Sequence, residues 1–214
     1  MRFLKIIVIL FLVFFGSNYG YREKVAWAVP AGSKGKSAVK TKDSTNRKLE
    51  FFYYIPKSYV PGKKLPVLIC VPGLDGSGAP FVAGRWSKFA DKNKFVIVSP
   101  SFRFNAQDWK EEKSYQYPQV WSGEALFKIL AKLGRSVDIY EDQLYLFGHS
   151  AGAQVVHRFA LWQPKSCKAV AAHAPGGVSF PAKWIPVKFL FTVGEKDKDR
   201  KQNVIEFAKR CKQY

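Results

Sequence analysis

The sequence predicts an α/β fold around a mostly parallel, doubly wound sheet, and two observations carry this prediction. First, apolar stretches of strand length alternate along the chain with stretches of helical periodicity, an order typical of parallel sheets. Second, the strands are apolar along their whole length, as expected where helices cover both faces of a sheet. The 214 residues are 47% hydrophobic and 16% aromatic, which favours one packed domain.

The first half of this domain supplies three expected strands and one helix. "LEFFYYI" (49–55) is strand-like, and "KLPVLICVPG" (64–73) is a buried strand that ends at Pro-Gly. "RWSKFADKN" (85–93) has helical spacing, and "KFVIVSP" (94–100) is again a continuous apolar strand. An aromatic and polar loop is expected over 101–117.

The second half continues the alternation. Helical periodicity predicts helices at about 118–133, at 150–162 ("SAGAQVVHRFALW") and at 199–213 ("DRKQNVIEFAKRCKQ"). Apolar runs predict strands at 142–148 ("DQLYLFG"), 167–174 ("CKAVAAHA") and 186–194 ("PVKFLFTVG").

Residues 1–28 have the order of charges and apolar residues of a secretory signal. Arg2 and Lys5 precede the unbroken apolar run 6–15, which is too short for an ordinary membrane span. Ala26-Trp27-Ala28 is a small-x-small cleavage site, and cleavage nearer Gly20 is an alternative. We therefore expect export to the periplasm or the extracellular space; an uncleaved membrane anchor and a buried first strand are the alternatives.

Residues 29–48 are rich in Gly, Ser and Lys and almost free of large apolar side chains. This composition predicts a flexible leader. The domain itself is then expected over 49–214.

The formal net charge of the chain is +19, with the lysines scattered along it. No nucleic-acid-binding module accompanies this charge, so no nucleic-acid partner is expected. The charge fits a solvated basic surface, or alternatively attraction to anionic envelope surfaces.

Three cysteines show no spacing of a metal site, and no metal is expected. Cys70 lies inside an apolar strand and is expected to be buried. A disulfide between Cys167 and Cys211 is left open.

Gly148-His149-Ser150-Ala151-Gly152 fits the G-x-S-x-G pattern of a nucleophile elbow, between an expected strand and an expected helix. The two glycines permit a sharp turn and close packing that a Cβ would obstruct. Ser150 would then sit exposed at a helix N-terminus, where developing negative charge is favoured. The alternative for Ser150 is a simple helix cap.

With these residues, the chain resembles the α/β-hydrolases, in particular the exported esterase branch with polyhydroxybutyrate depolymerases and feruloyl esterases. The resemblance covers about 48–207 and rests on "FFYYIPKSYVPGKKLPVLICVPG", "WSKFADKNKFVIVSP", "LYLFGHSAGAQVVHRFAL" and "FLFTVGEKD". It implies an oxyanion hole formed by the backbone N–H groups of Leu74 and Ala151.

The resemblance also implies an acid after the strand that follows the elbow unit. Asp197 stands three residues past Gly194 and is the candidate, with Glu195 and Asp199 as competitors. Asp199 has another role available, because Asp199 and Gln202 resemble a capping box at the start of a helix.

The histidine of such a triad should follow the acid, but no histidine follows Asp197. We therefore expect the domain to be incomplete at its C-terminus, with the last strand and the histidine loop missing. His149, His157 and His173 are poorly placed substitutes, of which His173 is the best. A hydrolase without its base is expected to be slow or inactive.

The expected function is hydrolysis of carboxylic esters, small or polymeric, through an acyl-enzyme on Ser150, without any cofactor. Aromatic side chains of loop 101–121 are expected either to line a substrate pocket or to form a hydrophobic flap; the pocket candidates are Trp109, Tyr115, Tyr117 and Trp121. Two alternatives remain open: a peptidase of the same fold, and a non-catalytic basic protein that binds the cell envelope. The natural substrate and the oligomeric state are not predicted.

Overall fold

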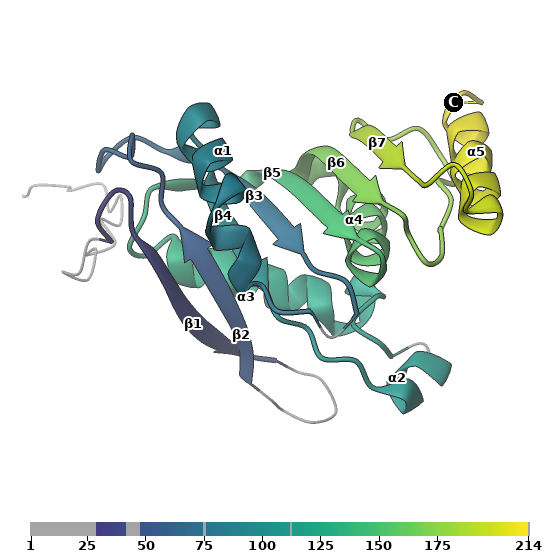
Figure 1. Ribbon diagram of the computed structural model, residues 1–214, viewed down its shortest axis with the longest axis horizontal. Helices are drawn as coiled ribbons and strands as arrows, with labels where there is room; N and C mark the ends of the chain where they lie inside the picture. The colour runs from purple at the N-terminus through teal and green to yellow at the C-terminus, as the bar shows by residue number, and fades with distance from the viewer. Residues whose placement is uncertain (1–28, 42–47, 75, 112, 214) are drawn as a thin grey trace, which may run out of the picture.

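A computed structural model describes residues 29–41, 48–74, 76–111 and 113–213. These residues form a seven-stranded sheet in the order β1-β2-β4-β3-β5-β6-β7 (Figure 1). The pairs β1–β2 and β2–β4 are antiparallel, whereas β4–β3, β3–β5, β5–β6 and β6–β7 are parallel. The expected α/β fold with a mostly parallel sheet is confirmed.

Nearly every element follows the alternation that the apolar runs predict. The strands are β1 Lys34–Lys40, β2 Lys48–Tyr54, β3 Leu65–Val71, β4 Val96–Pro100, β5 Ile139–His149, β6 Cys167–His173 and β7 Lys188–Thr192. The α-helices are α1 Arg85–Asn93, α2 Ala106–Lys110, α3 Gly123–Leu133, α4 Ala151–Trp162 and α5 Lys198–Cys211. Short 3₁₀ turns, η1 Ala79–Val82 and η3 Pro164–Ser166, and a π-helical turn, η2 Pro118–Ser122, connect them.

The expected flexible leader over 29–48 is wrong for residues 34–40, which form the edge strand β1. All seven residues of β1 pair with β2. Val39 turns into the core and is buried, and Gly35 leaves room for the ring of Tyr53 on β2. The low hydrophobicity of this segment concealed the strand, because an edge strand buries few of its side chains.

Two apolar cores lie on the two faces of the sheet. On one face, α3 and α4 pack over the central strands, and Phe207 of α5 packs against the aromatic side chains of β7. On the other face, α1 and η1 cover β2, β3 and β4 (Figure 1). Because both faces of the central strands are covered, the side chains of β3 and β4 are almost entirely buried.

The strand β7 and the helix α5 form the end of the molecule opposite β1 (Figure 1). Cys211 of α5 is exposed here, whereas Cys70 and Cys167 are buried, and all three are free thiols rather than a Cys167–Cys211 disulfide. In the described part of the chain, no helix has the length and apolarity needed to cross a bilayer. The expected signal segment 1–28 lies outside the described residues.

Candidate active site

Ser150 is the single residue between the end of β5 and the start of α4, and its backbone has the strained conformation of an elbow. Its φ of +52° and ψ of −114° are values that L-residues rarely adopt. The Ser150 N–H donates to the backbone oxygen of His173 on the neighbouring strand at 2.9 Å. The sheet therefore holds the turn in place, and Ser150 follows the carboxyl end of β5 as predicted.

Both glycines of the elbow are required by the close approach of backbone segments. A Cβ on Gly152 would overlap the carbonyl oxygens of Val71 and Pro72 at the end of β3. A Cβ on Gly148 would overlap the carbonyl of Gly152 itself. The predicted packing role of this pair is thus visible in the contacts, and the first turn of α4 lies directly against the start of the neighbouring loop.

The loop after β3 passes beside the elbow. A Cβ on Gly73 would lie 3.2 Å from His149 Nδ1 and 3.7 Å from Ser150 Cβ. The loop is fixed by two hydrogen bonds: Gly76 N–H donates to Gly73 O at 3.0 Å, and Gly78 N–H donates to Ser101 Oγ at 2.9 Å. Leu74, the predicted oxyanion donor of this loop, is 51% exposed and follows Gly73 directly.

The other predicted oxyanion donor, Ala151, is the first residue of α4. Its N–H belongs to the helix N-terminus, where backbone donors have no partner within the helix. Ala151 thus follows Ser150 directly, and Leu74 follows Gly73, the loop residue that approaches Ser150.

A row of polar side chains crosses the carboxyl edge of the sheet beside Ser150. His149, His173 and Thr192 are register partners on β5, β6 and β7. The rings of His149 and His173 stack with centroids 5.3 Å apart, and His173 Nδ1 is 2.8 Å from Thr192 Oγ1. Partial burial, and then the charges of His173 and Arg200, lower the pKa of His149.

None of the three histidines is hydrogen-bonded to the side chain of Ser150. Within residues 29–41, 48–74, 76–111 and 113–213, no hydrogen bond connects the hydroxyl of Ser150 to a side chain. His173 uses its Nδ1 for Thr192, and His157 lies buried in α4.

Asp197, the predicted acid, follows β7 and is bonded to the helix that comes after it. It is the N-cap of α5: Asp197 Oδ1 accepts from the Arg200 N–H at 3.3 Å, and Oδ2 forms an ion pair with Arg200 at 2.8 Å. The expected capping role of Asp199 is therefore wrong, because Asp197 caps the helix. Its competitor Glu195 is exposed in the preceding turn.

His157 and Arg158 of α4 hold two loops that border the site. The Ser179 N–H donates to His157 Nε2 at 3.0 Å, so His157 carries its proton on Nδ1 and donates to Ala153 O at 2.7 Å. Burial lowers the pKa of His157 to about 3, which keeps the ring neutral. Arg158 donates to Gln116 O at 3.1 Å and to Ser179 Oγ at 3.0 Å.

Arg158 also lies over the ring of Tyr117, with its guanidinium carbon 4.4 Å from the ring centroid. One buried helix face thus joins the loop after β4 to the loop after β6. Sequence patterns did not indicate this role, because nothing in the spacing of His157 and Arg158 separates it from ordinary packing.

The four predicted pocket residues do not line one common pocket. Tyr115 is 2% exposed and stacks on Phe102 with centroids 5.0 Å apart, so it belongs to the core and its assignment to a pocket is wrong. Trp109 and Tyr117 contact each other near the surface, where Trp109 is 39% exposed. Trp121 donates through Nε1 to Lys113 O at 2.9 Å and lines a cavity.

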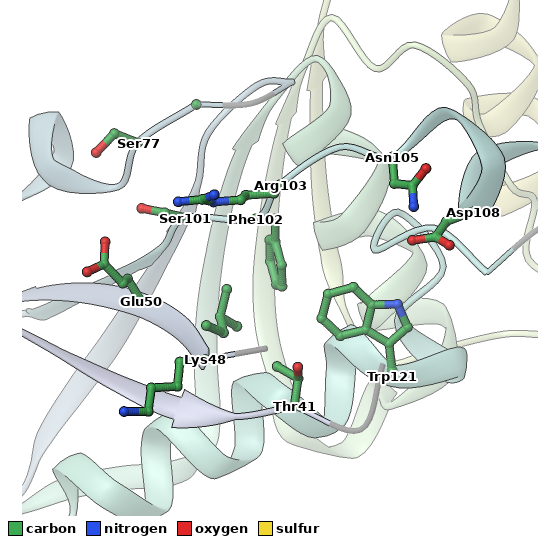
Figure 2. A pocket seen from close by; sticks show the side chains of 12 residues that line it. Thr41, Lys48, Glu50, Ser77, Ser101, Phe102, Arg103, Asn105, Asp108 and Trp121 are labelled. Atoms are coloured by element: carbon green, nitrogen blue, oxygen red, sulfur yellow. The ribbon is translucent and has the colours of Figure 1, made fainter. Parts of the chain in front are cut away.

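That cavity, of about 450 Å³, lies beside the predicted oxyanion loop. Figure 2 shows the Trp121 and Phe102 rings beside the side chains of Arg103, Asn105 and Asp108. The remaining lining residues are Thr41, Lys48, Leu49, Glu50, Gly76, Ser77 and Ser101. The polar members of loop 101–108 were missed in the sequence, since they show no motif.

A comparison with protein families matches residues 42–211 to a model described as "Putative esterase". No curated protein matches the chain significantly. The solved structure of a poly(3-hydroxybutyrate) depolymerase from Bordetella parapertussis is 26% identical, with a TM-score of 0.57. The alignment covers 78% of this chain and 67% of the depolymerase.

Two further solved structures share the fold at lower identity. A ferulic acid esterase is 14% identical, with a TM-score of 0.56. The alignment covers 85% of this chain and 97% of the esterase. Dipeptidyl peptidase 4 of Porphyromonas gingivalis is 15% identical, with a TM-score of 0.64. The alignment covers 86% of this chain and 30% of the peptidase.

Proposed function

The chain belongs to the esterase family whose model spans residues 42–211, and from this premise we propose that it is a serine hydrolase of carboxylic esters. The observation that carries the proposal is the backbone of Ser150, with φ at +52° between two glycines that admit no side chain. A residue held in such a conformation costs free energy, and this cost is typical of functional turns.

In the proposed reaction, the Ser150 hydroxyl gives its proton to a general base or to water while Oγ attacks the ester carbonyl carbon and forms a tetrahedral intermediate. The backbone N–H groups of Leu74 and Ala151 stabilise the negative charge that develops on the former carbonyl oxygen. Collapse releases the alcohol, which takes up a proton, and leaves the acyl group on Ser150. Water then attacks the acyl-enzyme and releases the acid. The approach of Gly73 to Ser150 supports this arrangement, because it places the loop of Leu74 beside the nucleophile.

We further propose that Asp197 acts as the acid that orients a base. Asp197 follows β7 at the same edge of the sheet as Ser150, and its two hydrogen bonds occupy one site on each oxygen. A carboxylate oxygen accepts more than one hydrogen bond, so the pair with Arg200 leaves room for an imidazole.

None of the three histidines is proposed as that base. His157 is buried and neutral, His149 stacks on His173, and His173 bonds Thr192. The 214-residue chain should therefore turn over slowly, with the residual rate that an oxyanion hole alone supports. Export from the cytoplasm and attraction to anionic envelope surfaces are part of the same proposal, supported by residues 1–28 and the charge of +19.

Labelling with a fluorophosphonate probe tests the nucleophile. We expect slow, stoichiometric labelling of the intact chain at Ser150, located by peptide mass, and none in Ser150→Ala. His173→Ala should label at the same rate as the parent chain. A rate that falls in His173→Ala would identify His173 as the base and contradict this part of the proposal.

Substrate class is tested with a matched pair of chromogenic substrates. Short-chain nitrophenyl esters should be cleaved above the rate of Ser150→Ala, and peptide anilides should not. Cleavage of the anilides at a comparable rate would indicate a peptidase, and no labelling together with no cleavage would favour a non-catalytic protein.

A further inference from the structure

The cavity of about 450 Å³ lies at the carboxyl edge of the sheet, on the side of β2 and β4. Its walls include Gly76 and Ser77 of the loop after β3, and several residues from 101–108 of the loop after β4. In the sheet, the strands β3, β5 and β6 separate β4 from β7 (Figure 1). The cavity is therefore built by loops of the central sheet, at a distance from β7 and α5.

The loop after β3 connects this cavity to Ser150. A Cβ on Gly73 would lie 3.7 Å from Ser150 Cβ, and the Gly76 N–H donates to Gly73 O at 3.0 Å. The two glycines are thus the first and fourth residues of a tight turn, whose Cα atoms lie within about 7 Å of each other. Gly76 itself lines the cavity. An ester whose carbonyl lies at Ser150 therefore reaches the cavity with a chain that crosses a single turn.

Two serine hydroxyls in the wall of the cavity are held by backbone donors. Ser77 Oγ accepts from the Ala79 N–H at 3.1 Å, and Ser101 Oγ accepts from the Gly78 N–H at 2.9 Å. A Cβ on Gly78 would overlap the Ser99 carbonyl, so this segment packs tightly against the end of β4. Neither hydroxyl donates a hydrogen bond within the described residues. Each therefore retains one donor for a ligand in the cavity.

Arg103 adds a cation to the same cavity. Figure 2 shows its side chain extended toward the side that carries Ser101 and Glu50, whereas Asp108 lies on the opposite side. Glu50 forms an ion pair with Lys36 at 3.2 Å, and Arg103 forms no ion pair with any described residue. The guanidinium thus brings a positive charge and a planar set of N–H donors that no carboxylate of the described residues occupies.

Phe102 and Trp121 supply an apolar wall of the cavity. Phe102 is 2% exposed and meets the Trp121 ring edge-on, with centroids 5.8 Å apart. The indole is held in turn by the hydrogen bond from Trp121 Nε1 to Lys113 O at 2.9 Å. An occupant that complements the cavity is therefore apolar along its length and carries an anionic acceptor at the end that faces Arg103.

We propose that this cavity binds a carboxylate at the far end of an ester substrate, with Arg103 as the principal binding residue. The carboxylate accepts two parallel N–H bonds from the guanidinium, and its remaining lone pairs accept from the hydroxyls of Ser77 and Ser101. The chain between this carboxylate and the scissile ester crosses the turn that ends at Gly76. Because the cavity serves Ser150, the assignment rests on the proposed function, and it names the substrate class: esters with a carboxylate at the end of their acyl or alcohol part.

Binding is measured by isothermal calorimetry on the full chain with Ser150→Ala, which leaves the esters intact. Nitrophenyl hydrogen suberate carries a carboxylate on its acyl part, and ω-acetoxyoctanoate carries one on its alcohol part; the methyl ester of each removes the charge. We expect at least one carboxylate to bind about tenfold more tightly than its methyl ester.

Arg103→Gln, added to this chain, should abolish the preference. Arg103→Lys keeps the charge without the planar pair of donors, so it should restore part of the preference. The matched control Arg135→Gln removes an equal charge at an exposed position that does not line the cavity, and it should keep the preference of the parent chain.

Three outcomes would overturn the assignment. The first is no binding of either carboxylate, or equal binding of each carboxylate and its methyl ester. The second is a preference that survives Arg103→Gln or falls equally in Arg135→Gln, which would show that net charge attracts the anion. The third is equal binding of the nitrophenyl ester of ω-hydroxyoctanoic acid, which would assign the donors to a hydroxyl group. A carboxylate preference without ester cleavage by the chain that retains Ser150 would support the cavity and contradict the proposed function.

Discussion

The backbone of Ser150 is held in a conformation that its own side chain disfavours. A non-glycine residue at positive φ costs about 1–3 kcal/mol, and Ser150 has φ at +52°. The hydrogen bond to His173 O and the close packing of Gly148 and Gly152 hold the turn against this cost. The position of Ser150 therefore depends on the two glycines on either side of it.

Gly152→Ala should displace the elbow. The added Cβ would meet the carbonyl oxygens of Val71 and Pro72, which are backbone atoms of a central strand and cannot turn away. We expect a loss of about 1–3 kcal/mol in the free energy of unfolding, measured by denaturant, and loss of probe labelling at Ser150. Gly194→Ala is the control, since nothing lies within 4 Å of its Cβ. Equal stability of the two variants would contradict this account.

His157 should make the stability of the protein depend on pH. Its pKa is lowered to about 3 in the folded chain, from an ordinary value of 6.5. Between these values the unfolded chain binds a proton that the folded chain does not. The free energy of unfolding is therefore complete above pH 6.5 and falls as the pH is lowered towards 3, by up to about 1.4 kcal/mol per pH unit from this residue.

His157→Gln tests this dependence by thermal or denaturant unfolding at a series of pH values. The variant should show a shallower decline than the parent chain between pH 6.5 and pH 3. His173→Gln, which removes an exposed histidine, should keep the parent slope. A slope unchanged in His157→Gln would mean that this histidine is not neutral in the folded protein.

The helix α4 is hydrogen-bonded to the loop after β4 and to the loop after β6. Arg158 accounts for most of this effect, because it bonds Gln116 O, bonds Ser179 Oγ and covers the ring of Tyr117. The helix that begins at Ala151, the predicted oxyanion donor, thus also holds these two loops.

Arg158→Ala should release both loops together. It leaves the buried carbonyl of Gln116 without this donor, so we expect a loss of about 1–3 kcal/mol in stability. Hydrogen exchange should accelerate around Tyr117 and around Ser179, although the two lie 62 positions apart in the sequence. Arg135→Ala, at an exposed site beyond α3, should change neither loop. Acceleration in only one loop would show that they are not joined through Arg158.

The strands and helices with continuous apolar runs were predictable, and β1 was not. The runs in β3, β4 and β5 are long enough to identify a buried strand without any knowledge of its neighbours. In β1, only Val39 is buried, and the other residues are small or are lysines. Its strand conformation comes from the free edge of β2, which the local sequence does not contain.

At the scale of the whole molecule, the sequence predicted which parts meet but not how their side chains pair. The elbow, the loop of Leu74 and Asp197 all lie at the carboxyl edge of the sheet, because parallel strands bring their ends together. The pair between Asp197 and Arg200 and the burial of Tyr115 depend on contacts formed only in the folded chain. The roles of Ser150, Asp197, Leu74 and Ala151 remain predictions.

The order of the strands also determines how the chain reaches this structure. In the centre of the sheet, Val67 of β3 pairs with Leu144 of β5, so a long loop must close before the core can form. Among the described strands, β1 and β2 form the one antiparallel pair of consecutive strands, whereas the consecutive pairs β3–β4, β5–β6 and β6–β7 are parallel and need crossover connections. We therefore expect slow folding through intermediates in which apolar strands are exposed, and a chain that depends on chaperones until β5 has been synthesised.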